Sequence, residues 1–309
     1  MEGLPSFSDK EFWDDALEYY VESNALSAGD NGYVWDYFKY CLQTQNRFFF
    51  ENPLVPVILE RYNCNVFELS TDTKIYRARI DEERKYEHQC FLACEIKCIQ
   101  ERLKQEEDGF SDKVMLDFDK RRIRTIMKDS EYQEFVERKK YGFEGFDAKG
   151  SGAPPYYNIK TGGRCNPEYV SFLYAANDIH TAVAEVRPYF RDSVSIATLR
   201  TKRTLRLVDF YYELKRRGPV IIKGPDPFMN KIRSEFSILN KGNEQDYLIT
   251  QYLTLLAQSA GFDGIRFRSS LVRQGTNYVI FNNSNCIAIE SKMYTIPEVK
   301  YSVIPLLDT

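Results

Sequence analysis

The chain has 309 residues, of which 43% are hydrophobic and 28% are charged, and its formal net charge at pH 7 is −3. This length allows a substantial hydrophobic core, either in one large domain or in a catalytic domain with an extension. The slightly acidic balance disfavours broad nucleic-acid binding, which usually requires a strongly basic face.

The first residues of the chain contain neither the basic region nor the apolar region of a signal peptide. No stretch approaches the roughly eighteen apolar residues that a membrane-spanning helix requires. The 7 cysteines form an odd set without the spacing of a disulfide scaffold, which suits reduced thiols. We therefore expect a cytoplasmic protein that does not contact membranes.

Residues 1 to about 70 are rich in aromatic side chains and have the pattern of helices. Ser8 and Glu11 match a capping box at the start of a helix. We interpret this region as a helical N-terminal extension with a packing or partner-binding role. It contains no histidine, so it lacks the Arg-x4-His site that some helical nuclease domains carry.

Residues 81 to 150 form a charged insertion, and the alternating charges over 81 to 140 predict two helices with solvated faces. Cys90, Cys94 and Cys98 recur every four residues, opposite the leucines and isoleucines of the same helix. Sulfurs on successive helical turns lie about 6 Å apart, against the roughly 3.8 Å of tetrahedral zinc coordination. We expect no metal here and interpret the cysteines as small apolar residues of a helix buried on two sides.

Residues 142 to 163 contain several glycines and prolines, which predicts a mobile loop over a site. Farther along the chain, short strand patterns alternate with helices, the clearest of which spans 244 to 260 and ends at Gly261. The predicted strands span residues 170 to 175, 193 to 200, 205 to 210, 264 to 267, 277 to 281 and 286 to 291. The sequence therefore predicts a mixed α/β (α+β) domain over residues 71 to 309 behind the helical extension.

The segment from residue 152 to 190 gathers groups that suit a phosphate, a flat ring and a sugar. Gly162-Gly163 lets the backbone approach a ligand closely, and Arg164 beside it carries a planar, permanently charged fork. Tyr174 lies in a predicted strand, with its hydroxyl available. Asp178 can cap a short helix in which Glu185 lies beside the apolar stripe. Taken singly, each also fits an ordinary role: a surface ion pair, core packing or a solvated helix position.

Three blocks in a fixed order give the chain a resemblance to RES-domain proteins. The first is Tyr76-Arg77-Ala78-Arg79, the second is the segment 152 to 190, and the third runs from Gly261 through Ser269-Ser270 to Phe281. The similarity covers roughly residues 74 to 285. This family is named for an arginine, a glutamate and a serine. The resemblance implies a fold like that of ADP-ribosyltransferases and the activity of toxins from bacterial toxin–antitoxin pairs that destroy NAD.

The resemblance also implies roles for individual residues. The catalytic set is Glu185, Arg77 and Ser269, with Arg79 as the alternative to Arg77 and Ser270 as the alternative to Ser269. The residues implied to bind NAD are Arg164, Tyr174, Arg79, Tyr76, Ser270 and Asn277. The charged insertion departs from the family in length, and it bears on the geometry around Arg77.

The implied reaction breaks the bond between nicotinamide and ribose as positive charge moves from the ring nitrogen onto the sugar. A carboxylate beside the sugar stabilises that charge, which is the role implied for Glu185. The arginines would hold the diphosphate, and the tyrosine and serine would orient the nicotinamide ribose. Because nicotinamide leaves as a neutral molecule, no general acid is needed to protonate it. The resemblance implies NAD as the substrate, and we expect no cofactor and no metal.

Three functions remain open at this point. The first is NAD consumption, by hydrolysis or with inorganic phosphate as the acceptor. The second is transfer of ADP-ribose to a protein or nucleic acid, for which the acidic chain shows no obvious docking surface. The third is a binding module that no longer reacts, although every motif position has the expected residue type. A free toxin would kill its host, so the resemblance also implies a cognate antitoxin protein; a homo-oligomer stays open.

Overall fold

The computed structural model describes residues 6–22, 32–45, 51–105, 113–211, 227–237 and 247–300. The chain divides into two compact units, and each unit is assembled from segments that are far apart in the sequence. Unit 1 comprises residues 1–73, 153–174 and 201–285. Unit 2 comprises residues 74–152, 175–200 and 286–309.

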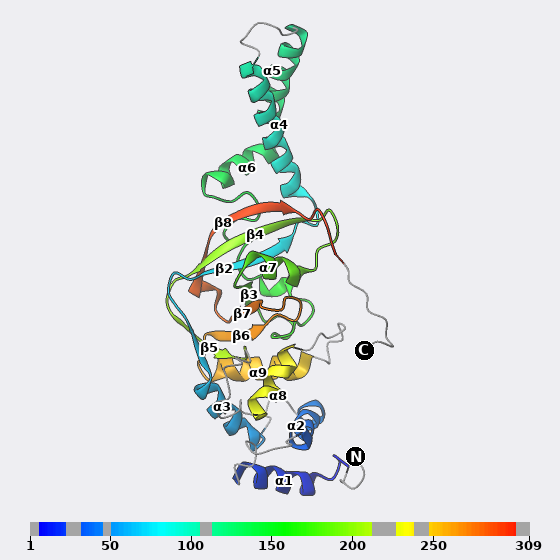
Figure 1. Ribbon diagram of the computed structural model, residues 1–309, viewed down its shortest axis with the longest axis vertical. Coiled ribbons are helices and arrows are strands. Elements are labelled where there is room, and N and C mark those ends of the chain that lie inside the picture. The colour runs from blue at the N-terminus through cyan, green and yellow to red at the C-terminus, as the bar shows by residue number, and fades with distance from the viewer. Residues whose placement is uncertain are drawn as a thin grey trace, which may run out of the picture. The chain divides into compact units, whose positions relative to one another are not determined.

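Unit 1 contains a mixed sheet in the order β1-β5-β6-β7, which are Val66–Leu69, Leu205–Asp209, Gly264–Arg268 and Thr276–Ile280. Strands β5 and β6 are parallel, whereas β1 and β7 pair with their neighbours in the antiparallel sense. A parallel pair needs a long crossover connection, and helices α8 (Pro227–Ser237) and α9 (Leu248–Ser259) lie in it. Figure 1 shows both helices beside these strands.

The N-terminal helices of unit 1 are α1 (Lys10–Glu22), α2 (Gly32–Thr44) and α3 (Leu54–Cys64). Trp13, Phe38 and Ile58 from these helices belong to one buried cluster with Leu253 of α9 and Phe267 of β6. The helical extension therefore shares its hydrophobic core with the sheet. Its first helix is capped by Asp9, whose carboxylate accepts from the Phe12 amide at 3.4 Å, rather than by Ser8.

Unit 2 contains strands in the order β3-β2-β4-β8, which are Leu173–Ala176, Lys74–Ile80, Ser193–Thr201 and Cys286–Thr295. The first two residues of β3 belong to unit 1. Strand β2 pairs with β3 and with β4 in the antiparallel sense. Helix α7 (Ile179–Val186) packs against β2 through a small cluster that includes Ala78, Ala182 and Ile196.

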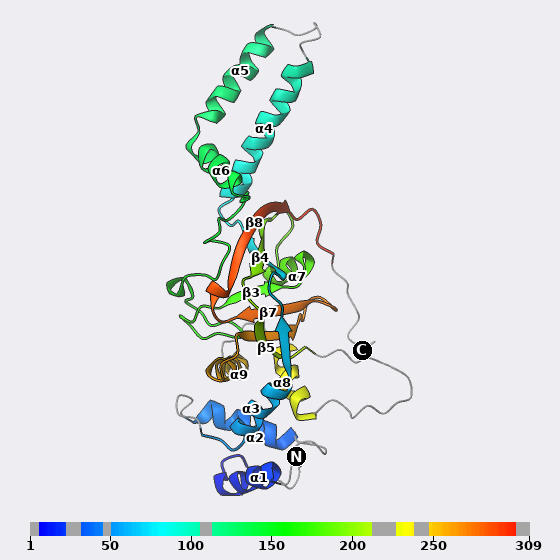
Figure 2. The same cartoon turned by 90° about the vertical axis from the view of Figure 1, so that its left-hand side faces the viewer.

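Three further helices of unit 2 form what we call the helical arm: α4 (Lys85–Gln105), α5 (Lys113–Met127) and α6 (Ser130–Lys140). Helices α4 and α5 run side by side (Figure 2), joined by Leu92, Ile96 and Ile126. The sequence predicted two helices for residues 81 to 140, whereas the structure has three. Asp129 interrupts the second helix, because its carboxylate accepts from the amides of the next turn and starts α6.

The cysteines of α4 lie on the predicted face of the helix, but their predicted burial was wrong. Leu92, Ile96 and Ile99 are buried, and Cys94 and Cys98 lie opposite them as predicted. However, Cys94 and Cys98 are exposed to solvent and Cys90 is only partly buried, so the expected burial on two sides was wrong for most of the helix. The other predicted strands and the helix at 248–259 are confirmed to within a few residues, and the fold is mixed α+β. Residues 244–246 of the predicted helix lie outside the described part.

Candidate active site

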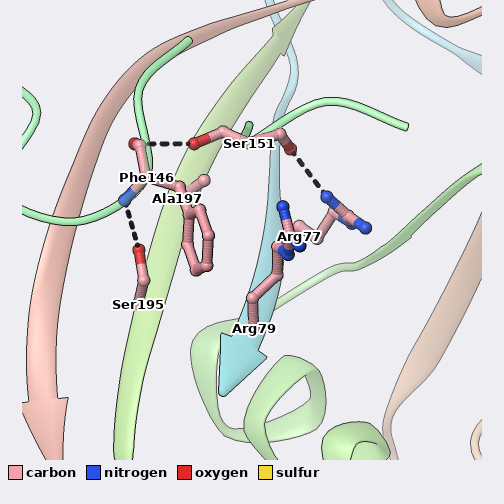
Figure 3. Close-up of a pocket in the computed structure, with 6 residues that line it drawn as sticks. All are labelled: Arg77, Arg79, Phe146, Ser151, Ser195 and Ala197. Atoms are coloured by element: carbon pink, nitrogen blue, oxygen red, sulfur yellow. Dashed lines mark hydrogen bonds between the residues drawn. The ribbon is translucent and has the colours of Figure 1, made fainter. Parts of the chain in front are cut away.

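Strand β2 carries two arginines on one face. Side chains alternate along a strand, so Arg77 and Arg79 point away from the face on which Ala78 packs against α7. The strand register places Ala197 of β4 opposite Arg77 and Ser195 opposite Arg79. Together they line a small pocket in unit 2 (Figure 3), which the surrounding side chains and loop fill, so a ligand would have to displace the loop.

The loop of residues 145 to 152 closes over these arginines with its backbone carbonyls. The Arg77 Nη1 atom donates to the carbonyl of Ser151 at 3.2 Å, to that of Gly150 at 3.5 Å, and to that of Gly152. The Arg79 Nη1 atom donates to the Gly150 carbonyl at 2.6 Å. The carbonyl oxygens of the loop thus accept the hydrogen bonds that the oxygens of a bound phosphate could accept.

Phe146 and three hydroxyls hold the loop in this position. The Arg79 guanidinium carbon lies 4.0 Å from the centroid of the Phe146 ring, a cation–π contact. The Phe146 amide donates to Ser195 Oγ at 3.2 Å, and the Phe146 carbonyl accepts from Ser151 Oγ at 3.0 Å and Ser291 Oγ at 2.8 Å. Figure 3 shows the first two of these bonds.

Gly145 permits the close approach of this loop to β4. A Cβ atom added at Gly145 would lie 2.1 Å from Ser195 Oγ and 2.9 Å from the sulfur of Met293. No local sequence pattern marks Phe146 or Ser195, and neither residue was predicted. The only usable signal was the density of glycines between residues 142 and 152.

The two arginines have no acidic counter-charge in the part of the chain that the structure describes, since no ion pair there includes Arg77 or Arg79. Burial, and then the neighbouring charge of Arg79, lowers the pKa of Arg77 to about 10. Arg77 is still a cation at neutral pH. Main-chain carbonyls accept hydrogen bonds from the Nη1 atom of each guanidinium. They leave its positive charge uncompensated, which favours a bound anion.

Helix α7 presents Glu185 near its end. Asp178 caps the helix, accepting from the Thr181 amide at 2.8 Å and from the Thr181 hydroxyl at 2.7 Å. Thr181 and Ala182 are buried. Glu185 follows them by one helical turn and therefore lies on the same side of the helix, yet it is exposed. The helix ends at once, because Arg187 adopts a left-handed conformation with φ 48°.

Within unit 2, Arg77 and the helix that carries Glu185 lie on opposite faces of strand β2. Helix α7 packs on the face of β2 that carries Tyr76 and Ala78, whereas Arg77 and Arg79 lie on the opposite face. Tyr76 therefore shares a face of the strand with the helix of Glu185, and the arginines do not. The assignment of Arg77 and Glu185 to one site stays a prediction.

In unit 1, Arg164 and Tyr174 lie in one short loop–strand segment. The Tyr174 hydroxyl accepts from the Cys165 amide at 3.0 Å and donates to Asn166 Oδ1 at 2.6 Å. Burial raises the pKa of Tyr174 well above its ordinary value. The expectation of an available hydroxyl was wrong, because Asn166 and a backbone amide already bind it. The role of the ring in NAD binding remains a prediction.

The surroundings of Arg164 explain the glycine pair before it. The Arg164 guanidinium donates to the Phe236 carbonyl and lies 5.9 Å from the Phe267 ring centroid. A Cβ atom at Gly162 would lie 2.8 Å from the Gln251 side-chain nitrogen, and one at Gly163 would lie 2.8 Å from Asn166 Oδ1. The glycines thus allow close packing against the chain itself.

Ser269 lies buried at the end of β6, two residues after Phe267. Its hydroxyl accepts from the amides of Leu271 and Val272, both at 3.1 Å, and so closes a tight turn. Ser270, next to it, is partly exposed. Asn277 is buried in β7, directly across from Phe267. The segment therefore places Ser269, Ser270 and Asn277 at the same end of the β6–β7 pair.

Comparison with known proteins identifies the family. A family model for the RES domain matches residues 136–302, more than half of the chain, and the chain belongs to this family. The matched segment contains Arg164, Tyr174, Glu185 and Ser269. It begins after Arg77, so the assignment of that arginine depends on the Tyr76–Arg79 motif alone.

Other comparisons add little. No curated protein matches the chain at a significant level. A chain of the crystal structure of the M. tuberculosis MbcT-MbcA toxin-antitoxin complex is similar, with a TM-score of 0.38 and 10% identity over 77% of this chain and 92% of that chain. Among the described residues, no helix combines the length and apolar character that crossing a membrane requires.

Proposed function

We propose that this RES-domain chain cleaves the nicotinamide–ribose bond of NAD and depletes the dinucleotide, acting as a bacterial toxin or defence effector. The observation that carries the proposal is Glu185 within the RES match: a carboxylate on the buried side of a short capped helix that is nevertheless open to solvent. A substrate can reach such a group, while the cap and the packed side chains before it hold the helix in place.

The reaction follows from the charge of the substrate. The bond between C1′ of the ribose and the pyridinium nitrogen breaks, and its electron pair moves to the nitrogen. Nicotinamide then leaves as a neutral molecule, so neither a general acid nor a cofactor is required. The positive charge passes to the sugar, where the Glu185 carboxylate stabilises it. An acceptor oxygen bonds to C1′, and a water acceptor releases one proton.

The remaining candidates would hold the substrate. Arg77, Arg79 and Arg164 carry planar cationic forks suited to the two phosphates. Support for Arg77 and Arg79 comes from their positive charge, which no acid among the described residues offsets. Ser269 and Asn277 would orient polar groups of the nicotinamide ribose. Because an active enzyme of this kind harms its host, the proposal includes a cognate antitoxin protein.

Product analysis tests the proposal and identifies the acceptor. The purified full chain is incubated with NAD in buffers with and without inorganic phosphate, and nicotinamide, ADP-ribose and phosphorylated ADP-ribose are separated by chromatography. We expect one nicotinamide released for each NAD consumed. A glycohydrolase yields ADP-ribose in both buffers, whereas a phosphorylase needs phosphate and yields the phosphorylated sugar. Intact NAD in both buffers contradicts the proposal, and ADP-ribose attached to a macromolecule indicates a transferase instead.

A further inference from the structure

The outward face of α1 is acidic and carries aromatic rings. Trp13 and Leu17 face the core. On the opposite side of the helix, the exposed acids are Glu11, Asp15 and Glu18. Phe12 and Tyr19 on the same side are 42% and 67% exposed. None of the ion pairs among the described residues includes these three carboxylates. We call this surface the acidic face.

The outward face of α5, in the helical arm, has the opposite charge. Asp119 and Ile126 face α4 and are buried. The exposed cations on the other side of the helix, including the residue directly after it, are Lys120, Arg121, Arg124 and Lys128. Arg121 pairs with Asp117 at 2.8 Å, and no ion pair of the described chain includes the other three. Phe118 borders this side and is 63% exposed. We call this surface the basic face.

The basic face is unusual for an acidic chain. Residues 120–128, KRRIRTIMK, contain five basic residues and no acid, although the whole chain has a net charge of −3. Residues 8–22 hold six acids and one lysine. The two faces are similar in length, since Glu11 to Tyr19 and Phe118 to Lys128 each cover two to three helical turns. Each face offers both charge and exposed aromatic rings.

We infer that the acidic face of one copy of this chain docks onto the basic face of a second copy. The charge complementarity between the two helices selects the partner, and burial of Phe12, Tyr19 and Phe118 would supply apolar contact area. Each copy has one face of each kind, so the contact is heterologous. Such contacts close into rings or continue as open chains.

The electrostatic character of the contact sets its expected behaviour. Exposed opposite charges raise the association rate and the specificity more than the affinity. Screening shortens the reach of these charges from about 10 Å at 0.1 M salt to about 3 Å at 1 M. We therefore expect self-association that grows with protein concentration and weakens as salt is added.

Sedimentation velocity of the full chain over a range of concentrations, at low and at high salt, gives the first test. The inference predicts species heavier than the monomer at low salt and a shift toward the monomer at high salt. A monomer at every concentration overturns the inference. A contact between the two faces of a single chain would give this result and would equally overturn it. So does an oligomer whose mass is independent of salt.

A charge-swap experiment identifies the surfaces. The first variant combines Asp15→Lys with Glu18→Lys on the acidic face, and the second combines Lys120→Glu with Arg124→Glu on the basic face. Each variant alone should associate at least tenfold more weakly than the wild type. An equimolar mixture should associate again, because each reversed face then meets a reversed partner. Circular dichroism checks that each variant is folded. If both are folded and their mixture does not associate, the assignment of the two faces is overturned.

Matched reversals elsewhere provide the control. Glu68→Lys on β1 and Lys202→Glu after β4 change the same charges at exposed positions outside both faces, and they should leave the association unchanged. Addition of duplex nucleic acid tests the competing use of the basic face. Binding of nucleic acid that requires Lys120 and Arg124, without any self-association of the protein, would overturn the inference in favour of a nucleic-acid surface.

Discussion

Arginines have different partners at the α4–α5 interface of the helical arm and in the β2 pocket of unit 2. In the arm, Arg102 forms a two-pronged ion pair with Asp119 at 3.0 Å, and Arg122 forms one with Glu95 at 2.7 Å. In the pocket, Arg77 and Arg79 meet only main-chain carbonyls and an aromatic ring. At the α4–α5 interface a carboxylate compensates the guanidinium charge, whereas no acid among the described residues does so in the pocket.

This contrast separates structural cations from those available to a ligand. An ion pair satisfies a guanidinium both in hydrogen bonding and in charge, so nothing is left for an anion to add. Carbonyl groups satisfy only the hydrogen bonds, and an anion that replaces them gains the full electrostatic attraction. The pocket, rather than the α4–α5 interface, is therefore where we expect the phosphate groups of NAD to bind.

The largest effect on stability should come from breaking the ion pair between Arg102 of α4 and the buried carboxylate of Asp119. Arg102→Ala leaves the Asp119 carboxylate, whose side chain is 4% exposed, without its cation. We expect the free energy of unfolding to fall by about 2–3 kcal/mol, less than for a fully buried pair because Arg102 is 53% exposed. Urea unfolding measures it, with Arg121→Ala on the exposed side of α5 as the control. An equal, small effect of both changes would contradict the structural role of the buried pair.

The next effect should appear in substrate binding. Arg77→Gln removes the charge and keeps some hydrogen-bonding capacity, so kcat/KM for NAD should fall by about 10- to 100-fold, the range for a hydrogen bond to a charged group. Arg122→Gln in the arm should leave kcat/KM unchanged. If folded Arg77→Gln protein retains wild-type kinetics, Arg77 only ties down the loop of residues 145 to 152.

The loop itself can be loosened at Gly145. Gly145→Ala introduces a Cβ atom against Ser195 Oγ, so the loop or β4 must shift. We expect a loss of about 1–3 kcal/mol in the free energy of unfolding and faster proteolysis within residues 145 to 152. Lys149→Ala, an exposed position in the same loop, provides the comparison. Unchanged proteolysis in the glycine variant would show that the loop tolerates the added methyl group.

The smallest effect should be seen at the exposed ion pair of the arm. The hydrogen bonds from Arg122 lower the pKa of Glu95. A carboxyl group with a lowered pKa contributes stability above its unfolded pKa, about 4.3, and loses that contribution as the pH falls through the folded value. Arg122→Ala should therefore be slightly less stable than the wild type at pH 7, and the difference should be smaller near pH 3. Thermal unfolding at both pH values measures the difference, and a constant difference would contradict this assignment.

The sequence predicted local features well. The alternation of apolar residues predicted the strands of residues 193 to 201 and 264 to 268. The predicted cap of helix α7 by Asp178 is confirmed. Such features depend on neighbours within a few positions along the chain. Helix α8 and the strand Lys74–Ile80 were missed although both have a period. Tyr76, Ala78 and Ile80 alternate with two arginines, and Phe228, Ile232 and Phe236 recur every four residues.

The surroundings of the site could not be predicted in this way. The partners of Arg77 are main-chain carbonyls more than seventy positions away, and a carbonyl leaves no mark in a sequence. The hydroxyl of Tyr174 is bound by Asn166, whose side chain is positioned by the loop. That Arg77 and α7 lie on opposite faces of β2 follows from strand pairing, which no motif records.

The central claim is that Glu185 stabilises the sugar cation, and the rate of nicotinamide release from NAD tests it most directly. Glu185→Gln keeps the shape of the side chain and removes its charge. Glu137→Gln makes the same change in the last turn of α6, where the side chain is 62% exposed. We predict wild-type rates for the α6 variant and a fall of about 100- to 1,000-fold for Glu185→Gln, the range seen when one stabilising group is removed. Equal rates for the two variants would contradict the account.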